Sequence, residues 1–333
     1  MKLHPAVENA YKVLDGKPLS EAEALALAEL SGNDILDLVS LANKVRDKFA
    51  HKIVPCSIIN AKSGVCSQNC KFCAQSAHHA TGIDTYPLLA PEEIIASARK
   101  VYSEGVRSYG IVTSGCGYLD ADDPEFRKIL GAMDRLHAEF PDLKVCVSLG
   151  ILSEETAKAL AEHGAYRYNM NLQTNPARYA ELVSDTHTIE EKIRTIKYLQ
   201  KYGVTICCGG IFGMGETLDE LVEFAFALRE VAPDSIPVNF LDPIAGTPLG
   251  GREFPPREQI FDTIAVLRLV NPRTPLRFAG GRRRLSDADA AQAIYVGINA
   301  GIQGPLLTTP GAVYADDRHL AAAAGYATES GGD

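Results

Sequence analysis

Three cysteines in one short stretch carry the strongest chemical signal in the sequence. Cys66, Cys70 and Cys73 form a C-x3-C-x2-C pattern. Three thiolates this close together can bind three irons of a 4Fe–4S cluster, whose corners normally take four cysteines. No fourth cysteine lies nearby in the sequence, so the spacing predicts a cluster with one iron open to another ligand. Zinc is the alternative, because His78 and His79 follow closely and a structural zinc site needs four ligands.

The other five cysteines are scattered along the chain. Eight cysteines among 333 residues are too few for a disulfide-stapled protein. In a reducing compartment, clustered cysteines indicate metal or redox chemistry. Cys56 falls inside an expected strand and is interpreted as a core residue. The remaining four are Cys116, Cys146 and the adjacent pair Cys207 and Cys208.

The elements that must position these cysteines alternate along the chain. The first fifty residues have helical spacing, and Ser20 with Glu23 forms a capping box at the start of one helix. From about residue 53, short β-rich runs alternate with longer helical stretches, which predicts parallel βαβ units. The expected strands are 53–60, 107–113, 144–149, 166–172, 204–208, 235–241, 276–279 and 300–303, and the expected helices are 91–103, 124–139, 153–163, 189–202, 218–231, 257–269 and 287–296.

Eight strand–helix units would close a (β/α)8 barrel of TIM type, preceded by an N-terminal helical extension. An open doubly wound sheet is the alternative, but no G-x-G-x-x-G turn follows the first strand. The cysteine triad follows that strand, at the end of the barrel where active sites are built. We expect residues 1–50 to form a helical lead-in, 51–315 the barrel and 316–333 a C-terminal tail.

Charge and hydropathy argue against several classes of partner. A net charge of -9 disfavours nucleic acid and anionic membranes, which attract basic surfaces. No apolar run approaches the roughly 18 residues that a membrane span needs. The first residues lack the apolar region of a signal peptide. We therefore expect a cytoplasmic protein that binds neither nucleic acid nor membrane.

The cysteine triad, with Phe72 before its last member, resembles the signature of the radical S-adenosylmethionine (SAM) superfamily. This resemblance implies that SAM binds the open iron through its amino and carboxylate groups. Its reductive cleavage would give a 5′-deoxyadenosyl radical that abstracts a hydrogen atom from the substrate. The barrel pattern expected around the triad fits the same superfamily.

A closer resemblance, over about residues 50–315, is to the biotin synthase family. That family is a group of sulfurtransferases that insert sulfur between the methyl and methylene carbons of dethiobiotin, using one SAM for each C–H bond. The resemblance also implies a homodimer and an electron donor such as flavodoxin or ferredoxin. The stretches that carry it are 58–64, 74–76, 148–150, 168–172, 213–217, 235–241, 246–249 and 306–309.

In this family the sulfur comes from an auxiliary 2Fe–2S cluster bound by three cysteines and an arginine. Cys146, Cys207 and Arg277 match three of those ligands, but the remaining position, on the second strand, is Gly110 here. We therefore hypothesise a differently ligated auxiliary cluster, and four thiolates would suit four irons better than two. The hypothesised thiolates are Cys116, Cys146, Cys207 and Cys208.

Several of these ligand positions have competing interpretations. Neighbouring residues on a strand face opposite ways, so Cys207 and Cys208 can both point inward only at a bulge or strand end. Gly209 and Gly210 directly after them permit such a break. The alternative for Cys116 and Cys208 is a small core residue, since free cysteines are commonly buried. Arg277 could instead pair with a structural anion or bind a substrate carboxylate.

Polar residues near the ends of the expected strands resemble cofactor and substrate contacts of the family. Asn171 and Asn239 resemble residues that bind the ureido ring of dethiobiotin, which an amide suits because it both donates and accepts hydrogen bonds. Gln173 stands where the family often has Asp. The residues that resemble SAM contacts are Thr113, Ser114, Gly115, Asn171 and Gln173.

Two other functions stay open at this point. One is a radical SAM paralogue that acts on another small molecule, such as a cofactor-maturation enzyme, and the missing strand-two cysteine favours it. The other is a non-catalytic iron–sulfur or zinc-stabilised protein, which would bind no SAM. Asn171, Asn239 and the extra cysteines favour biotin formation over the paralogue, and a non-catalytic protein would not need a full barrel around the cluster.

Overall fold

The computed structural model describes residues 2–304, 306–308, 319–320, 322, 324 and 326. Its centre is a parallel sheet with the strand order β7-β6-β4-β2-β1-β11-β10-β9-β8. The strands are β1 (Val54–Lys62), β2 (Ser108–Thr113), β4 (Lys144–Ser148), β6 (Arg167–Asn169), β7 (Thr205–Cys207), β8 (Gly210–Phe212), β9 (Ile236–Phe240), β10 (Leu276–Phe278) and β11 (Ala300–Gln303).

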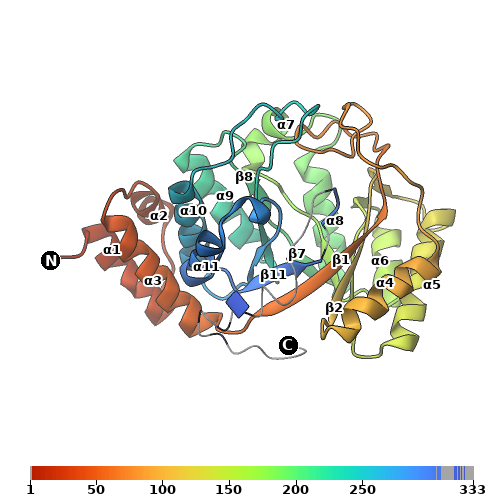
Figure 1. Ribbon diagram of the computed structural model, residues 1–333, viewed down its shortest axis with the longest axis horizontal. Coiled ribbons are helices and arrows are strands. Elements are labelled where there is room, and N and C mark those ends of the chain that lie inside the picture. Colours follow the sequence, from red (N-terminus) through yellow and green to blue (C-terminus); the bar gives the residue numbers. More distant parts are fainter. Residues whose placement is uncertain are drawn as a thin grey trace.

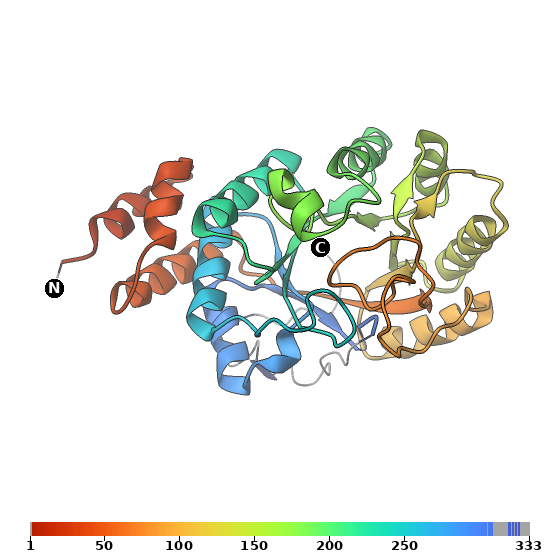
Figure 2. The ribbon, with the colours of Figure 1, turned by 90° about the horizontal axis from the view of Figure 1, so that it is seen from above.

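The strands β7 and β8 are two parts of one broken strand, and together they close the sheet. β7 pairs with β6, and β8 pairs with β9. Two bridges, between Cys207 and Ser235 and between Gln173 and Gly210, connect the parts across the break. Eight strand positions therefore surround the centre, with helices outside them (Figure 2). This confirms the predicted (β/α)8 barrel.

The break in the fifth strand follows from two close backbone approaches. A Cβ at Gly209 would lie 2.0 Å from Pro237 O, and one at Gly210 would lie 2.6 Å from Gln173 O. Only glycine allows neighbouring backbones this near. The predicted break is therefore present, but it does not turn both cysteines inward. Cys207 lines the central cavity, whereas Cys208 is packed into the apolar core.

Amphipathic helices cover the barrel. In α5, the buried residues Phe126, Ile129, Met133 and Leu136 recur every three or four positions, and the side chain of Asp123 caps the first turn. The covering helices are α4 (Pro91–Ser103), α5 (Pro124–Glu139), α6 (Glu154–Glu162), α8 (Ile189–Lys201), α9 (Leu218–Val231), α10 (Arg257–Val270) and α11 (Asp287–Val296).

The N-terminal residues form α1 (Pro5–Ala10), the 3-10 turn η1 (Tyr11–Asp15), α2 (Glu21–Ala28) and α3 (Asp34–Phe49). Ser20 and Glu23 form the predicted capping box of α2. These helices stand at one side of the barrel beside α9, α10 and α11 (Figure 1). Most of the predicted tail, 316–333, lies outside the described residues. No helix among the described residues has the length and apolar character to cross a membrane.

The loops after the strands carry short elements that the sequence analysis did not predict. β3 (Gly117–Tyr118) pairs with β5 (Ile151–Leu152) beyond the ends of β2 and β4. η2 (Pro176–Arg178) and α7 (Tyr179–Leu182) follow β6, and η3 (Arg282–Arg284) follows β10. The long segment 63–90 follows β1 at the same end of the barrel as α7 (Figure 1). This end is where a barrel builds its active site.

Candidate active site

The loop that follows β1 carries the cysteine triad, and backbone hydrogen bonds fix its course. Cys66 N donates to Gln75 O (3.0 Å), and Ala77 N donates to Cys66 O (2.8 Å). Lys71 N donates to Val183 O (2.9 Å), which ties the loop to the segment after α7. All three triad thiols are partly buried and free of disulfides. The fold therefore presents them together on one ordered loop.

The two histidines considered as zinc ligands are engaged elsewhere. His78 Nε2 lies 3.0 Å from Ser67 O, and His79 Nε2 lies 3.1 Å from Cys70 O. Among the described residues, no three His, Cys, Asp or Glu side chains gather closely enough for a single metal ion. In an iron–sulfur cluster each thiolate binds its own iron, so the thiols stand farther apart. The triad thus fits a cluster better than zinc.

Burial favours the protonated thiols of Cys70 and Cys73 when they bind no metal. It raises the pKa of Cys70 to about 12, with a further contribution from Cys73. Burial likewise raises the pKa of Cys73. Iron must therefore displace these protons, since the thiolate is the metal ligand.

A buried lysine beside the triad is a feature that the sequence analysis missed. Lys192, in α8, donates a hydrogen bond to Asn171 O (3.0 Å). Burial lowers its pKa, and a thiolate at Cys70 would raise it. Its place in an amphipathic helix is typical of a surface lysine, so the sequence alone gave no sign of it.

The residues that resemble SAM contacts lie around this loop. Ser114, directly after β2, donates through Oγ to Gly64 O (2.7 Å), two residues before Cys66. Thr113 ends β2, and its Oγ1 is buried without a partner in the described structure. Gly115 follows with a φ of 128°, which favours glycine. The end of β2 is therefore joined directly to the start of the triad loop.

Asn171 and Gln173 lie on the wall of the central cavity. Asn171 Oδ1 accepts a hydrogen bond from Gly209 N (3.1 Å). Gln173 has a φ of 76°, and its Oε1 is buried without a partner among the described residues. A buried polar atom without a partner is uncommon in proteins and fits a site for a polar ligand.

Asn239 also lines the cavity, and backbone groups hold its amide in place. Its Nδ2 donates to Gly210 O (2.8 Å), and its Oδ1 accepts from Gly280 N (2.8 Å). Asn239 therefore links β8 to the segment after β10. One amide hydrogen and one oxygen lone pair stay available to a ligand.

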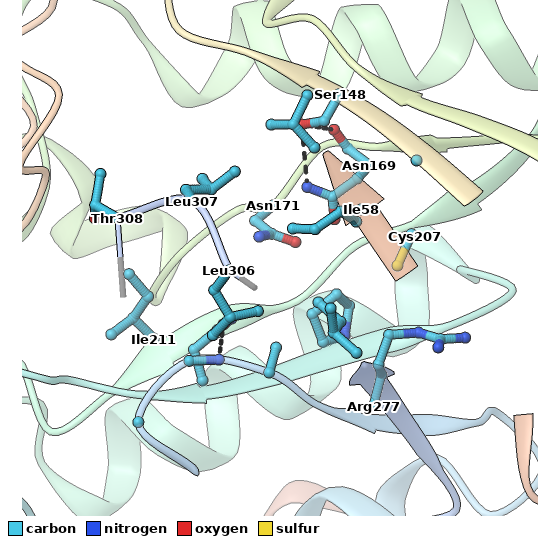
Figure 3. A pocket seen from close by; sticks show the side chains of 18 of the residues that line it. Ile58, Ser148, Asn169, Asn171, Cys207, Ile211, Arg277, Leu306, Leu307 and Thr308 are labelled. Atoms are coloured by element: carbon cyan, nitrogen blue, oxygen red, sulfur yellow. Dashed lines mark hydrogen bonds between the residues drawn. The ribbon is translucent and has the colours of Figure 1, made fainter. Parts of the chain in front are cut away.

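One cavity of about 310 Å³ runs from the triad loop into the barrel. Phe72 and Cys73 contribute to its wall at the loop, and Asn171 lies part of the way along it. Figure 3 shows Cys207 and Arg277 toward one end of this cavity, with Leu306, Leu307 and Thr308 toward the other. Its size is typical of a site for a small organic molecule.

Three cysteines from different strands line the inner part of the cavity: Cys56 on β1, Cys146 on β4 and Cys207 on β7. The interpretation of Cys56 as a core residue was wrong, because its side chain belongs to the cavity wall. Arg277 lies with them and donates to Val54 O (3.0 Å) and to Ser235 Oγ (3.3 Å). No alternation in the sequence could reveal this, since both faces of a barrel strand are buried.

Cys116 and Cys208 do not join this inner group. Cys116 is exposed in the loop after β2, on the side of the triad, and Ile151 N donates to its carbonyl (2.8 Å). Burial raises the pKa of Cys116, with Cys66 as the next cause. Cys208 faces the apolar core. The structure thus brings together Cys146, Cys207 and Arg277 but separates the other two hypothesised ligands from them.

Comparison with known proteins agrees with this geometry. Residues 61–228 match the radical SAM superfamily, and residues 237–327 match the biotin and thiamin synthesis associated domain. Among solved structures, methylornithine synthase superposes with a TM-score of 0.81 at 18% identity, covering 96% of this chain and 97% of that one. The FeFe-hydrogenase maturase HydG from Carboxydothermus hydrogenoformans gives 0.77 at 18% identity, covering 98% of this chain and 80% of that one. Both similarities support the fold.

Relatives found by sequence identify the family, whereas the solved structures support only the fold. The biotin synthase of Pelodictyon phaeoclathratiforme is 48% identical over 326 residues, with 96% of each chain covered. That of Chlorobium luteolum is 47% identical, covering 96% of this chain and 97% of the relative. That of Chlorobaculum tepidum is 46% identical, covering 96% and 97%. The chain therefore belongs to the biotin synthase family of radical SAM enzymes.

Proposed function

We propose that this enzyme converts dethiobiotin to biotin by radical sulfur insertion. One observation carries the proposal: a single cavity connects the triad loop to the inner group of cysteines and arginine. A substrate in that cavity would lie between a radical source and a sulfur source. The identity to curated biotin synthases over nearly the whole chain supports the same reaction.

The residues at the triad end of the cavity would hold the radical source. Cys66, Cys70 and Cys73 would bind the 4Fe–4S cluster, which supplies the electron that splits SAM into methionine and a 5′-deoxyadenosyl radical. Lys192 adds a buried positive charge beside the triad, which favours an anionic group there. The SAM contacts in this proposal are Thr113, Ser114, Gly115, Asn171 and Gln173.

The amides on the cavity wall orient dethiobiotin. Asn171 and Asn239 lie on strands or strand ends and are held by backbone hydrogen bonds, so their positions are fixed before the substrate enters. Each can offer donors and acceptors to a ureido ring, which needs both. Apolar wall residues such as Ile58 and Ile211 suit an aliphatic chain and keep water from the radical.

Cys146, Cys207 and Arg277 would hold the auxiliary iron–sulfur cluster, which would supply the sulfur atom. The unusual ligand set of this chain is compatible with a two-iron or a four-iron cluster. Because these three residues line the inner part of the cavity, the sulfur would lie on the side of the substrate that faces away from the triad loop.

The wider setting of the enzyme belongs to the same proposal. Eight free thiols and two oxygen-sensitive clusters suit a reducing cytoplasm. Flavodoxin or ferredoxin would deliver electrons, and the enzyme would work as a homodimer. The division into a helical lead-in (1–50), a barrel (51–315) and a tail (316–333) is supported by strands that span residues 54–303.

Isotope transfer tests the reaction directly. Anaerobically reconstituted protein would be given SAM, dithionite and dethiobiotin deuterated at the methyl and methylene carbons that receive sulfur. We expect deuterium in the 5′-deoxyadenosine, measured by mass spectrometry, because the radical takes hydrogen from those carbons. Unlabelled 5′-deoxyadenosine in the presence of saturating deuterated substrate would show that dethiobiotin is not the hydrogen donor.

A further inference from the structure

We propose that Cys56 replaces the missing strand-two thiolate and binds the auxiliary cluster together with Cys146 and Cys207. The inference rests on the proposed function and deepens it by naming a ligand set for this chain. It departs from the sequence-based hypothesis, which used Cys116 and Cys208. It also departs from the pattern of the family, which places the third cysteine at position 110.

The strand register explains how a thiol on β1 can serve a site that lacks one on β2. β2 lies between β1 and β4, and Gly110 is paired with Ile58 on one side and Cys146 on the other. Cys56 stands two residues before Ile58, so both point to the same face of β1. That face is the cavity wall. Compared with the family pattern, the thiol is therefore on β1 instead of the neighbouring strand β2, and it still faces the barrel interior.

The close packing of Ile58 against Gly110 is consistent with a thiol on β1 in place of one on β2. A Cβ at position 110 would lie 3.0 Å from Ile58 Cγ2, closer than most side-chain contacts. Ile58 thus occupies the space where a strand-two side chain would begin. The site has no room for a second thiol beside Ile58 unless Ile58 shifts, whereas Cys56 reaches the cavity without obstruction.

Two buried arginines indicate that this part of the barrel holds negative charge. Arg277 is 2% exposed and Arg167 is 8% exposed, and both line the cavity. Nη2 of Arg277 and Nε of Arg167 are buried without a hydrogen-bond partner in the described structure. Neither arginine forms an ion pair with a carboxylate in the part of the chain that the structure describes. A buried charge without a counter-charge is strongly unfavourable.

A third buried arginine shows what a purely structural role looks like. Arg268, in α10, is fully buried, and each of its three side-chain nitrogens donates to at least one oxygen. Burial lowers its pKa to about 9. Arg277 differs, because its Nη2 is buried without a hydrogen-bond partner in the described structure, while Nε and Nη1 donate to Ser235 Oγ, Val54 O and Gly301 O. Arg277 and Arg167 thus each keep one nitrogen without a partner in a cavity that three cysteines also line.

Cys146 and Arg167 are direct register partners on β4 and β6, and Cys207 lies near both arginines. Metal-bound thiolates on Cys56, Cys146 and Cys207 would supply the negative charge that both guanidinium groups lack. Three thiolates and Arg277 equal the ligand number of the family pattern, so neither Cys116 nor Cys208 is needed. Arg167 adds a second positive charge beside the cluster.

Iron content tests the assignment without relying on turnover. Replacing Cys66, Cys70 and Cys73 by Ala removes the triad, so any cluster that the chain then takes up is auxiliary. In this background we expect Cys56→Ala to lose most of the auxiliary iron and acid-labile sulfide after anaerobic reconstitution. Cys208→Ala and Cys116→Ala are the matched controls and should retain both. Mössbauer spectra would follow the same cluster independently.

Circular dichroism and thermal unfolding would show whether each variant folds, and Cys56→Ser gives a closer match in size if the Ala variant does not. Full auxiliary iron in folded Cys56→Ser protein would overturn the proposal, and so would loss of iron in Cys116→Ala or Cys208→Ala. A triad-free chain that binds no iron would overturn it as well. The proposed function has its own test in biotin formation by the protein with an intact triad, so the two failures are distinguishable.

Discussion

The triad loop and the inner part of the barrel each bring three thiols together, but by different means. Cys66, Cys70 and Cys73 lie within eight residues, and one loop with its own hydrogen bonds positions them. Cys56 and Cys207 are 151 positions apart in the sequence, and only closure of the barrel brings them together. The spacing of the cysteines in the sequence predicts the first site, whereas the second site is formed only when the chain folds.

The two groups of thiols also differ in the positive charges that lie near them. Lys192 is a buried lysine near the triad, which occupies a partly exposed loop. Two arginines, Arg167 and Arg277, lie near the inner thiols in the closed barrel. A loop can recruit solvent and cofactor to balance its charge, whereas the interior must supply its own counter-ions. The comparison predicts that changes to the two groups separate SAM cleavage from sulfur insertion.

The largest effect should come from the triad. Cys70→Ser removes one of three ligands that no other residue on the loop can replace, so we expect SAM cleavage to fall to background. Anaerobic assay of 5′-deoxyadenosine with dithionite measures this. The auxiliary iron should remain, and its loss together with SAM cleavage would show that the two groups are not independent.

Arg277→Leu should act on the inner group alone. It removes a buried cation beside three thiols, so we expect loss of biotin formation and of auxiliary iron while 5′-deoxyadenosine is still produced. Arg268→Leu is the control: it leaves several buried carbonyls unpaired and should lower the free energy of unfolding by about 3 kcal/mol or more. Equal iron loss in both variants would reduce the role of Arg277 to folding.

Asn239→Ala should have a smaller, mixed effect. It leaves Gly210 O and Gly280 N without their side-chain partner, which should cost about 1–3 kcal/mol in urea unfolding. We also expect a higher KM for dethiobiotin with little change in SAM cleavage that is uncoupled from substrate. An unchanged KM would leave Asn239 with a structural role only.

The smallest effect should come from Glu23, far from both groups. Its hydrogen bond with Lys12 lowers the pKa of Glu23 to about 2. Because the folded pKa lies below the unfolded one, this stabilisation is present at neutral pH and is lost as pH falls through the range from about 4.5 to 2. Glu23→Gln should therefore destabilise the chain by less than about 1 kcal/mol at pH 7, and by less still at pH 4. Urea unfolding at both pH values checks this, and an equal difference at both would contradict it.

Periodicity and turn residues were enough to predict the alternation of strands and helices, and the Gly209–Gly210 break was expected at its observed place. The position of Cys56 could not be predicted, because apolar residues occur on both faces of β1 and nothing in the sequence marks the inner one. The hypothesis that Cys116 is an auxiliary ligand rests on its place six residues beyond Gly110, but the chain turns at Gly115 and Cys116 lies on the triad side. Lys192 and Arg167 required the register and the packing to be known.

The most direct test of the whole account is one anaerobic reaction of reconstituted protein with SAM, dithionite and dethiobiotin, in which both products are quantified by mass spectrometry. We predict 5′-deoxyadenosine and biotin together. 5′-Deoxyadenosine without biotin, in protein with full iron loading, would contradict sulfur insertion into dethiobiotin.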